Sequence, residues 1–129
     1  MNFHSGVVIR GKGRAGALGY PTVNIPLEDH GISGIYSALV KIGDGVNPAE
    51  PDARPEGFRE YIAAVFVDPK RKLLEAHLLD YSGELYGIEV AIELCEKIRG
   101  SEKFDDDEDL RLAIKKDISK VRDYFAKQS

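Results

Sequence analysis

The sequence predicts a mainly β protein, an antiparallel barrel or sandwich with one α-helix packed outside. Apolar residues recur with the two-residue period of strands in most segments before residue 100. In the last quarter of the chain the period changes to that of an amphipathic helix. Five or six predicted strands follow one another with turns and no helices between them, which argues against a parallel sheet. No internal repeat is visible, so residues 1–129 are expected to form one domain.

The first half of the chain contains three predicted strands. Residues 6–10 (GVVIR) form the first, and residues 20–25 form the second, because Pro21 biases the preceding residue towards an extended backbone. The third, residues 34–42 (GIYSALVKI), keeps most of its apolar side chains on one face. Residues 43–60 hold three of the six prolines and three glycines, so they are expected to form a long loop.

The second half is predicted to contain three further strands. Residues 61–67 and 72–81 flank the turn sequence Asp-Pro-Lys-Arg (68–71) and are expected to form a hairpin. In residues 86–99, Ile88, Val90, Ile92 and Leu94 alternate with more polar residues, which is the strand period.

A C-terminal helix is predicted at about residues 106–126, some 30 Å long at about 1.5 Å per residue. Acidic residues at 105–107 suit its start, where they cap free N–H groups and complement the helix dipole. Its apolar positions lie on one stripe: Leu110, Ala113, Ile114, Ile118, Val121 and Phe125.

Composition narrows the functional classes. The single cysteine, Cys95, excludes an internal disulfide and suits a cytoplasmic protein. No apolar run approaches the roughly 20 residues of a membrane span, and no signal peptide precedes the first strand. Because 22 acidic residues outnumber 18 basic ones, we expect no nucleic-acid partner and no membrane partner. A monomer is expected.

The stretch 11–24, GKGRAGALGYPTVN, suits phosphate binding. Its glycines allow backbone N–H groups to approach an anion closely. Thr22 and Asn24 lie two residues apart, so on an extended chain both side chains point the same way and offer oxygens that suit Mg²⁺. The simpler alternatives are a surface loop and two solvent-facing strand residues. A dinucleotide-binding fold is excluded, because it requires a helix at the third glycine of GKGRAG, whereas Pro21 follows.

Two charged residues on predicted strands are candidates for chemistry. Glu75 lies within the apolar run LLEAHLLD, where it is either a half-exposed strand residue or a base whose pKa is raised by burial. Arg99 ends the last strand as either a surface cation or an anion clamp. The three histidines show no metal-ligand spacing, and we interpret them as structural.

Taken together and in order, these motifs resemble the riboflavin kinase family. The resemblance rests on the glycine-rich loop with Pro-Thr-x-Asn (21–24), Glu-x-His-x-x-Asp (75–80), Leu-Tyr-Gly (85–87), and Ile98-Arg99 followed by Phe104. It extends over about residues 6–125. It implies a six-stranded Greek-key barrel, and transfer of the γ-phosphoryl group of ATP to the 5′-hydroxyl of riboflavin with Mg²⁺. No FAD synthesis is expected, because the chain shows no adenylyltransferase domain.

The resemblance also implies residue roles. Glu75 is implied to be the catalytic base, and Thr22 and Asn24 the Mg²⁺ ligands that also touch ATP. The other implied ATP-binding residues are Gly11, Gly16, Leu78, Asp80 and Tyr86, and the implied flavin-binding residues are Arg99 and Phe104.

The turn at 68–71 is shorter than is usual in this family, and the segment 99–104 begins Arg-Gly-Ser where the family has Arg-Pro-Glu. These differences motivate an alternative, a flavin- or nucleotide-binding module with little or no catalysis. A third hypothesis, a barrel that only binds proteins, requires that Thr22, Asn24 and Glu75 do not converge.

Overall fold

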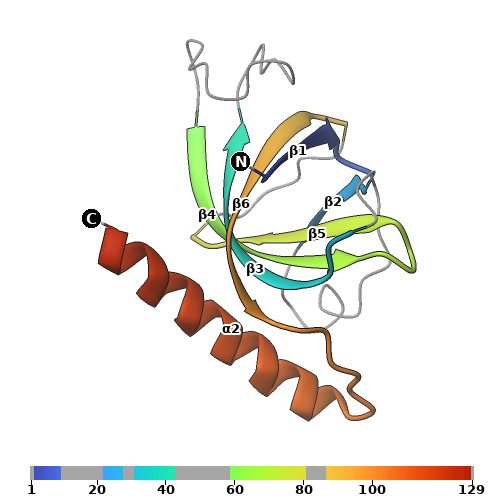
Figure 1. Cartoon of the computed structure of the whole chain (residues 1–129), viewed down its shortest axis with the longest axis vertical. Coiled ribbons are helices and arrows are strands. Elements are labelled where there is room, and N and C mark those ends of the chain that lie inside the picture. The colour runs from blue at the N-terminus through green and yellow to red at the C-terminus, as the bar shows by residue number, and fades with distance from the viewer. Residues whose placement is uncertain (1, 10–21, 28–30, 43–58, 81–86, 129) are drawn as a thin grey trace.

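The computed structural model describes residues 2–9, 22–27, 31–42, 59–80 and 87–128. These residues form a curved β-sheet with one helix lying along its outside (Figure 1). The elements are β1 (Asn2–Val7), β2 (Val23–Pro26), β3 (Gly34–Ile42), β4 (Arg59–Asp68), β5 (Leu73–Leu78), β6 (Glu89–Arg99) and α2 (Asp107–Gln128).

The six strands form one antiparallel sheet in the order β1-β6-β3-β4-β5-β2. Within it, β3, β4 and β5 follow one another, and β6 returns to lie beside β3, which is the Greek-key arrangement. The two ends of the sheet approach each other, because Ile9, just after β1, donates a 2.8 Å backbone hydrogen bond to Asn24 of β2. The predicted six-stranded Greek-key barrel with an external C-terminal helix is confirmed.

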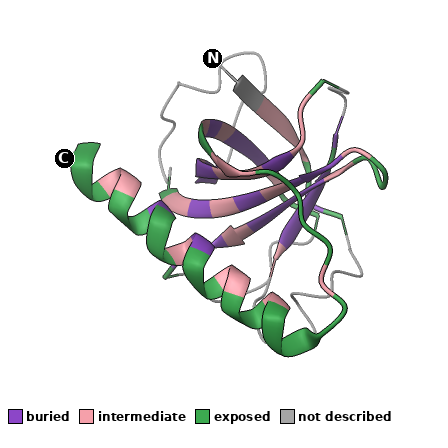
Figure 2. Ribbon diagram, turned by 60° about the horizontal axis from the view of Figure 1, so that its bottom comes forward, coloured by how far each residue is buried: buried purple, intermediate pink, exposed green. Residues whose placement is uncertain are grey.

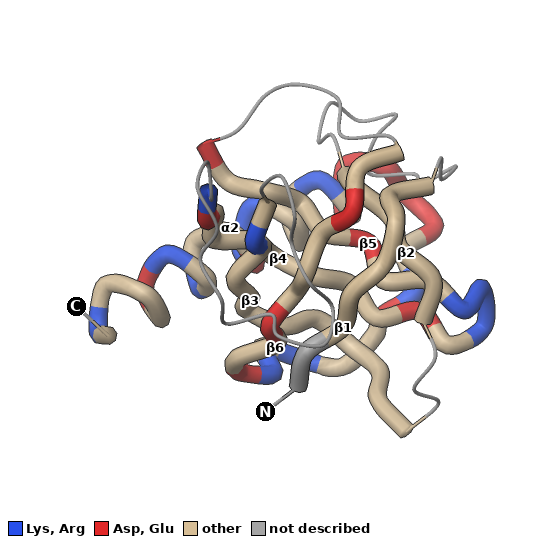
Figure 3. Tube along the Cα trace, turned by 90° about the horizontal axis from the view of Figure 1, so that it is seen from above, with Lys and Arg blue, Asp and Glu red and all other residues tan. Residues whose placement is uncertain are grey.

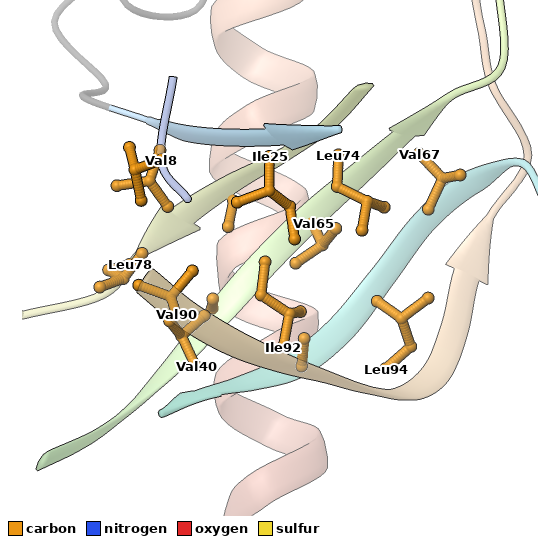
Figure 4. Close-up of a cluster of buried hydrophobic side chains, with 14 of the residues drawn as sticks. Val8, Ile25, Val40, Val65, Val67, Leu74, Leu78, Val90, Ile92 and Leu94 are labelled. Carbon is orange, nitrogen blue, oxygen red and sulfur yellow. The ribbon is translucent and has the colours of Figure 1, made fainter. Parts of the chain in front are cut away.

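The barrel interior is filled by alternate residues of the strands, as their period predicts. Branched aliphatic side chains from opposite sides point towards one another (Figure 4). Many of them are completely buried, including Ile25, Val40, Val65, Val67, Leu74, Val90 and Ile92. Each such side chain contributes about 1.5–3 kcal/mol relative to an exposed one. The packed interior therefore leaves the loops and the outer sheet face for a binding site.

Helix α2 packs against the outer face of β3 and β4. In Figure 2 its inner side is half-buried or buried and its outer side is exposed, which confirms the predicted apolar stripe. Val121 on this stripe is completely buried. The start of the helix is capped by Asp106, whose side chain accepts a 2.8 Å hydrogen bond from the Glu108 N–H.

Several strand ends differ from the predicted bounds. The first strand starts at Asn2, because residues 2–7 pair with β6. β5 ends at Leu78 and not at residue 81, since Asp80 has a left-handed backbone with φ of 60°. Ile88, which was expected on the buried face, precedes β6 and is 40% exposed. Residues 43–58 of the predicted loop lie outside the described residues.

The pairing of β3 with β6 shifts register twice, between Ile35 and Ala38. Such bulges bend a strand and redirect the side chains beyond them. The buried hydroxyl of Ser37 stabilises the bend, because its Oγ accepts a 3.0 Å hydrogen bond from the Glu96 N–H. Arg99 at the end of β6 is thereby placed opposite Ile35.

Gly34→Ala is expected to lower the free energy of unfolding by about 1–3 kcal/mol. Gly34 has φ of 105°, and an added Cβ would lie 2.6 Å from the backbone oxygen of Arg99. Urea denaturation measures the change. Gly100→Ala is the matched control, because its Cβ would meet open space. Equal unfolding midpoints for the two variants would contradict this account.

Candidate active site

A row of five paired residues crosses the outer face of the sheet. Asn24 on β2 pairs with Glu75 on β5, Glu75 with Phe66 on β4, Phe66 with Ile35 on β3, and Ile35 with Arg99 on β6. Directly paired residues of antiparallel strands point to the same face. This face is the outer one, because the neighbours of Glu75 on β5 are buried in the barrel interior.

Four members of the row, Glu75, Phe66, Ile35 and Arg99, line a pocket of about 370 Å³ between the sheet, the segment 100–104 and the start of α2. This volume is within the range of pockets that bind small molecules. Apolar side chains make up much of the wall, and the charged groups converge at a few points. The lining includes Thr22, Ile35, Phe66, Arg71, Glu75, His77, Arg99, Phe104, Leu110, Ile114 and Asp117.

Glu75 is a buried carboxylate on this pocket, 7% exposed. Burial raises its pKa, because a charged carboxylate loses hydration there. Arg71 opposes this effect: its Nη1 lies 3.3 Å from Glu75 Oε1, and its charge and hydrogen bond lower the pKa. A partly buried carboxylate with one cationic neighbour suits a group that must exchange a proton.

Arg99 is held at the opposite end of the row by helix α2. Its Nε and Nη2 donate hydrogen bonds of 2.8 and 2.9 Å to the two oxygens of Asp117, and its Nη1 donates one of 3.1 Å to the Gly100 carbonyl. The Phe104 ring lies 5.7 Å from the guanidinium carbon, in a cation–π contact. The bonds to Asp117 raise the pKa of Arg99, so the guanidinium stays charged.

Asn24 and Thr22 supply uncharged oxygens beside Glu75. Asn24 is 3% exposed, and its buried Oδ1 has no hydrogen-bond partner among the described residues. An oxygen in that state suits a hard cation. Across the described ranges, no three His, Cys, Asp or Glu side chains are grouped to hold a metal. One or two uncharged protein oxygens suit Mg²⁺, because this ion usually takes most of its ligands from water and from substrate phosphates.

The pocket brings together four of the predicted site residues, Thr22, Glu75, Arg99 and Phe104, while Asn24 pairs with Glu75 but does not line the pocket. Leu78 points into the core, and Asp80 is exposed and forms two 3.0 Å hydrogen bonds with Arg122 of α2. The remaining predicted residues, Gly11, Gly16 and Tyr86, lie outside the described residues.

Six polar residues that line the pocket were not predicted as site residues: Arg71, His77, Ser101, Glu102, Lys103 and Asp117. Arg71 lies in the predicted turn, and Asp117 lies within the predicted helix but is not one of the residues of its predicted apolar stripe. His77 had been interpreted as structural, although it shares a strand face with Glu75. Burial and the charge of Arg122 lower the pKa of His77, which favours its neutral imidazole. The alternation of β5 would have placed His77 beside Glu75, but nothing in the sequence pairs Asp117 with Arg99.

The fold is a Greek-key barrel with a pocket of the size that binds small molecules, and comparison with known proteins gives its family. The family model described as riboflavin kinase matches residues 2–125. The chain belongs to the riboflavin kinase family.

Its relatives are longer proteins. The chain is 33% identical over 125 residues to the bifunctional riboflavin kinase/FMN adenylyltransferase of Haemophilus influenzae, covering 93% of this chain and 37% of the relative. It is 30% identical over 131 residues to the RNA-binding riboflavin kinase RibR of Bacillus subtilis, covering 97% of this chain and 52% of the relative. The chain thus spans between about a third and a half of these relatives.

Solved structures show the same fold. The crystal structure of riboflavin kinase from Trypanosoma brucei superposes with a TM-score of 0.70 at 23% identity, covering 97% of this chain and 77% of that one.

Within the described residues, no helix combines the length and apolar character that crossing a membrane requires. Basic and acidic positions are interspersed along the described trace, α2 included (Figure 3).

Proposed function

We propose that this chain is a riboflavin kinase that transfers the γ-phosphoryl group of ATP to the ribityl 5′-hydroxyl of riboflavin, giving FMN and ADP. The observation that carries the proposal is the placement of buried Glu75 beside Asn24, on a pocket that Arg99 and Phe104 border, in a chain of the riboflavin kinase family. Phosphoryl transfer needs a positioned hydroxyl, neutralised phosphate oxygens and a base, and this pocket supplies residues suited to each.

Glu75 is proposed to accept the proton of the attacking 5′-hydroxyl. Its carboxylate faces the pocket, and its raised pKa makes it a better proton acceptor than an exposed carboxylate. The apolar and aromatic walls suit the flat flavin ring, with Phe104 and Arg99 on the side closed by the segment 100–104. The ring would thus be held between the sheet and α2, and the ribityl chain would extend towards Glu75.

ATP is proposed to bind at the β2 end of the row, beside Asn24 and Thr22, the latter two residues earlier in the chain. The bound Mg²⁺ would neutralise the phosphate oxygens, held by the Thr22 and Asn24 side chains. Backbone N–H groups of the glycine-rich loop, including Gly11 and Gly16, would hold the phosphates. Asp80 and Tyr86 are proposed to contact the nucleotide with their side chains, and Leu78, whose side chain lies in the core, with its backbone.

The direct test is to incubate the protein with riboflavin, ATP and Mg²⁺ and to separate the flavins by chromatography. Rapid FMN formation supports the kinase. Binding of riboflavin and ATP without FMN would favour the alternative, a non-catalytic module on the same barrel. The family membership of this chain gives that alternative less support.

Thr22→Ala is expected to raise the Mg·ATP concentration needed for half-maximal rate and to change riboflavin binding little. Thr22 lies on the β2 side of the pocket, away from the segment 100–104 that is proposed to contact the flavin. Titrating Mg·ATP at saturating riboflavin measures the change. The matched control is Ser101→Ala on the opposite wall of the pocket. An unchanged Mg·ATP requirement in Thr22→Ala would remove this residue from the metal site.

A monomer in the cytoplasm, without a nucleic-acid partner, remains our prediction. The acidic excess of the chain and its single cysteine are its only support. The RNA binding named for RibR belongs to that protein, of which this chain matches about half.

A further inference from the structure

Two hydrogen bonds join the end of β5 to the later part of helix α2. Arg122 donates from Nη1 and Nη2 to the two carboxylate oxygens of Asp80, each over 3.0 Å. The two planar groups thus meet in the bidentate geometry that arginine forms with carboxylates. Because 42 residues of chain separate the partners, the contact fixes the end of β5 relative to the helix.

The chain leaves the sheet at Asp80. The preceding residue, Leu79, is buried, and its N–H donates a 2.9 Å hydrogen bond to the carbonyl of Ile62 on β4. Asp80 itself has a left-handed backbone with φ of 60°. This conformation is unfavourable for a residue with a side chain, although aspartate tolerates it better than most residues. The hydrogen bonds from Arg122 therefore hold a backbone conformation that the chain would not strongly prefer by itself.

The ion pair is too exposed to contribute much to the stability of the barrel. The Asp80 side chain is 72% exposed and the Arg122 side chain is 47% exposed. Ion pairs between exposed groups add little to the free energy of unfolding, because water and salt screen them. Two hydrogen bonds with good geometry nevertheless restrict where the carboxylate lies. We therefore expect the pair to affect the position of Asp80 more than the stability of the fold.

Asp80 lies at the end of the β2–β5 pair where the nucleotide is proposed to bind. β2 runs antiparallel to β5, so its first residues lie beside the last residues of β5. In the sequence, β2 follows the glycine-rich stretch that is proposed to hold the phosphates. Burial lowers the pKa of His77 on the pocket wall, and the charge of Arg122 lowers it further, so this guanidinium stands close to the pocket.

We propose that Arg122 is a positioning residue for the nucleotide, which holds the Asp80 carboxylate where it accepts a hydrogen bond from the nucleoside part of ATP. A carboxylate has about four lone-pair sites, and the two bonds from Arg122 leave the others available. These sites suit the uncharged O–H and N–H donors of a nucleoside. The guanidinium also neutralises a carboxylate that would otherwise repel the phosphates. The proposal rests on the nucleotide contact of Asp80 in the proposed function.

The test measures the dissociation constant of Mg·ADP by calorimetry, which requires no turnover, in the wild type, Arg122→Met, Asp80→Gly and the double variant. Glycine removes the Asp80 side chain and adopts a left-handed backbone without strain. Arg122→Lys keeps the charge but not the two-bond fork. Lys120→Met, which removes another exposed cation of α2, is the matched control. Urea denaturation and riboflavin titration are carried out on every variant.

In Arg122→Met we expect the dissociation constant of Mg·ADP to rise about tenfold, the effect of losing one hydrogen bond to a charged group. The urea midpoint and the riboflavin affinity should match the wild type, because the flavin side of the pocket is held by Asp117. Asp80→Gly should show a similar rise, and adding Arg122→Met to it should change nothing further. Arg122→Lys should recover part of the affinity. In turnover, the KM for Mg·ATP should rise and kcat should be retained.

An unchanged Mg·ADP dissociation constant in Arg122→Met would overturn the proposal. An equal rise in Lys120→Met would overturn it too, because it would show a general charge effect. A further rise when Arg122→Met is added to Asp80→Gly would show that Arg122 does not act through Asp80. A lower urea midpoint together with weaker riboflavin binding would assign the pair to the fold alone.

The same measurements separate this proposal from the proposed function. If the wild type binds Mg·ADP in this Arg122-dependent way but makes no FMN, the kinase function fails and the positioning role stands. If the wild type makes FMN and Arg122→Met binds Mg·ADP normally, only the positioning role fails.

Discussion

Glu75→Gln is expected to lower the rate of FMN formation by about 10²–10⁴-fold while the barrel stays folded. The amide matches the carboxylate in shape and still accepts the hydrogen bond from Arg71, but it cannot take the proton of the 5′-hydroxyl. The loss should appear in kcat more than in the riboflavin KM, because the interaction develops in the transition state. Steady-state kinetics by FMN chromatography measures both.

The matched control is Glu96→Gln, which removes an exposed carboxylate from β6. It should retain the wild-type rate. Near-normal turnover by Glu75→Gln would remove Glu75 from the mechanism.

The unfolding temperature of Glu75→Gln is a second measurement, and the direction of its change relative to the wild type can be predicted. The pKa of Glu75 is higher in the folded state than in the unfolded state. At pH values between these two pKa values the folded state holds more protons than the unfolded state, so the free energy of unfolding falls as pH rises through this window. Gln carries no charge and avoids this loss. Above the window, Glu75→Gln should therefore unfold at an equal or higher temperature than the wild type.

Asp117→Ala is expected to lower the free energy of unfolding by about 3 kcal/mol, because it leaves the partly buried Arg99 guanidinium without its carboxylate. The same change should raise the riboflavin KM, since Arg99 and Phe104 border the pocket from a segment anchored by Asp117. Urea denaturation and riboflavin titration measure the two effects.

Asp123→Ala, at an exposed position of α2, is the matched control. Arg99→Met combined with Asp117→Ala should recover part of the lost stability, because no unpaired charge remains. An Asp117→Ala variant with the unfolding midpoint of Asp123→Ala would show that the ion pair does not hold the helix.

Local periodicity predicted the strands that are strongly alternating and bounded by glycine or turn residues. β3 matches the predicted residues 34–42 at both ends. The sequence NFHS at residues 2–5 has no such alternation, and these residues are extended only because β6 pairs with them. The extended conformation of these residues depends on a distant partner strand, and a local sequence pattern does not reveal such a partner.

The same distinction between local sequence patterns and long-range contacts applies to the residues of the candidate site. The strand parity of Glu75 and the spacing of Thr22 and Asn24 are local, so their common face was predictable. The bond between Arg99 and Asp117 depends on how α2 lies across β3 and β4, and on two bulges in β6. Neither leaves a periodic signal in the sequence.

The row of paired residues across the outer face joins strands that differ in how readily they open. It begins on β2, a strand of only four residues whose backbone pairs with β5 on one side and, among the described residues, meets β1 on the other only through the Ile9 bridge. Short edge segments open more readily than the strands at the centre of a sheet. We therefore expect the proposed metal and nucleotide end of the row, on β2, to open more often than the proposed flavin end, which is tied to β6 and α2.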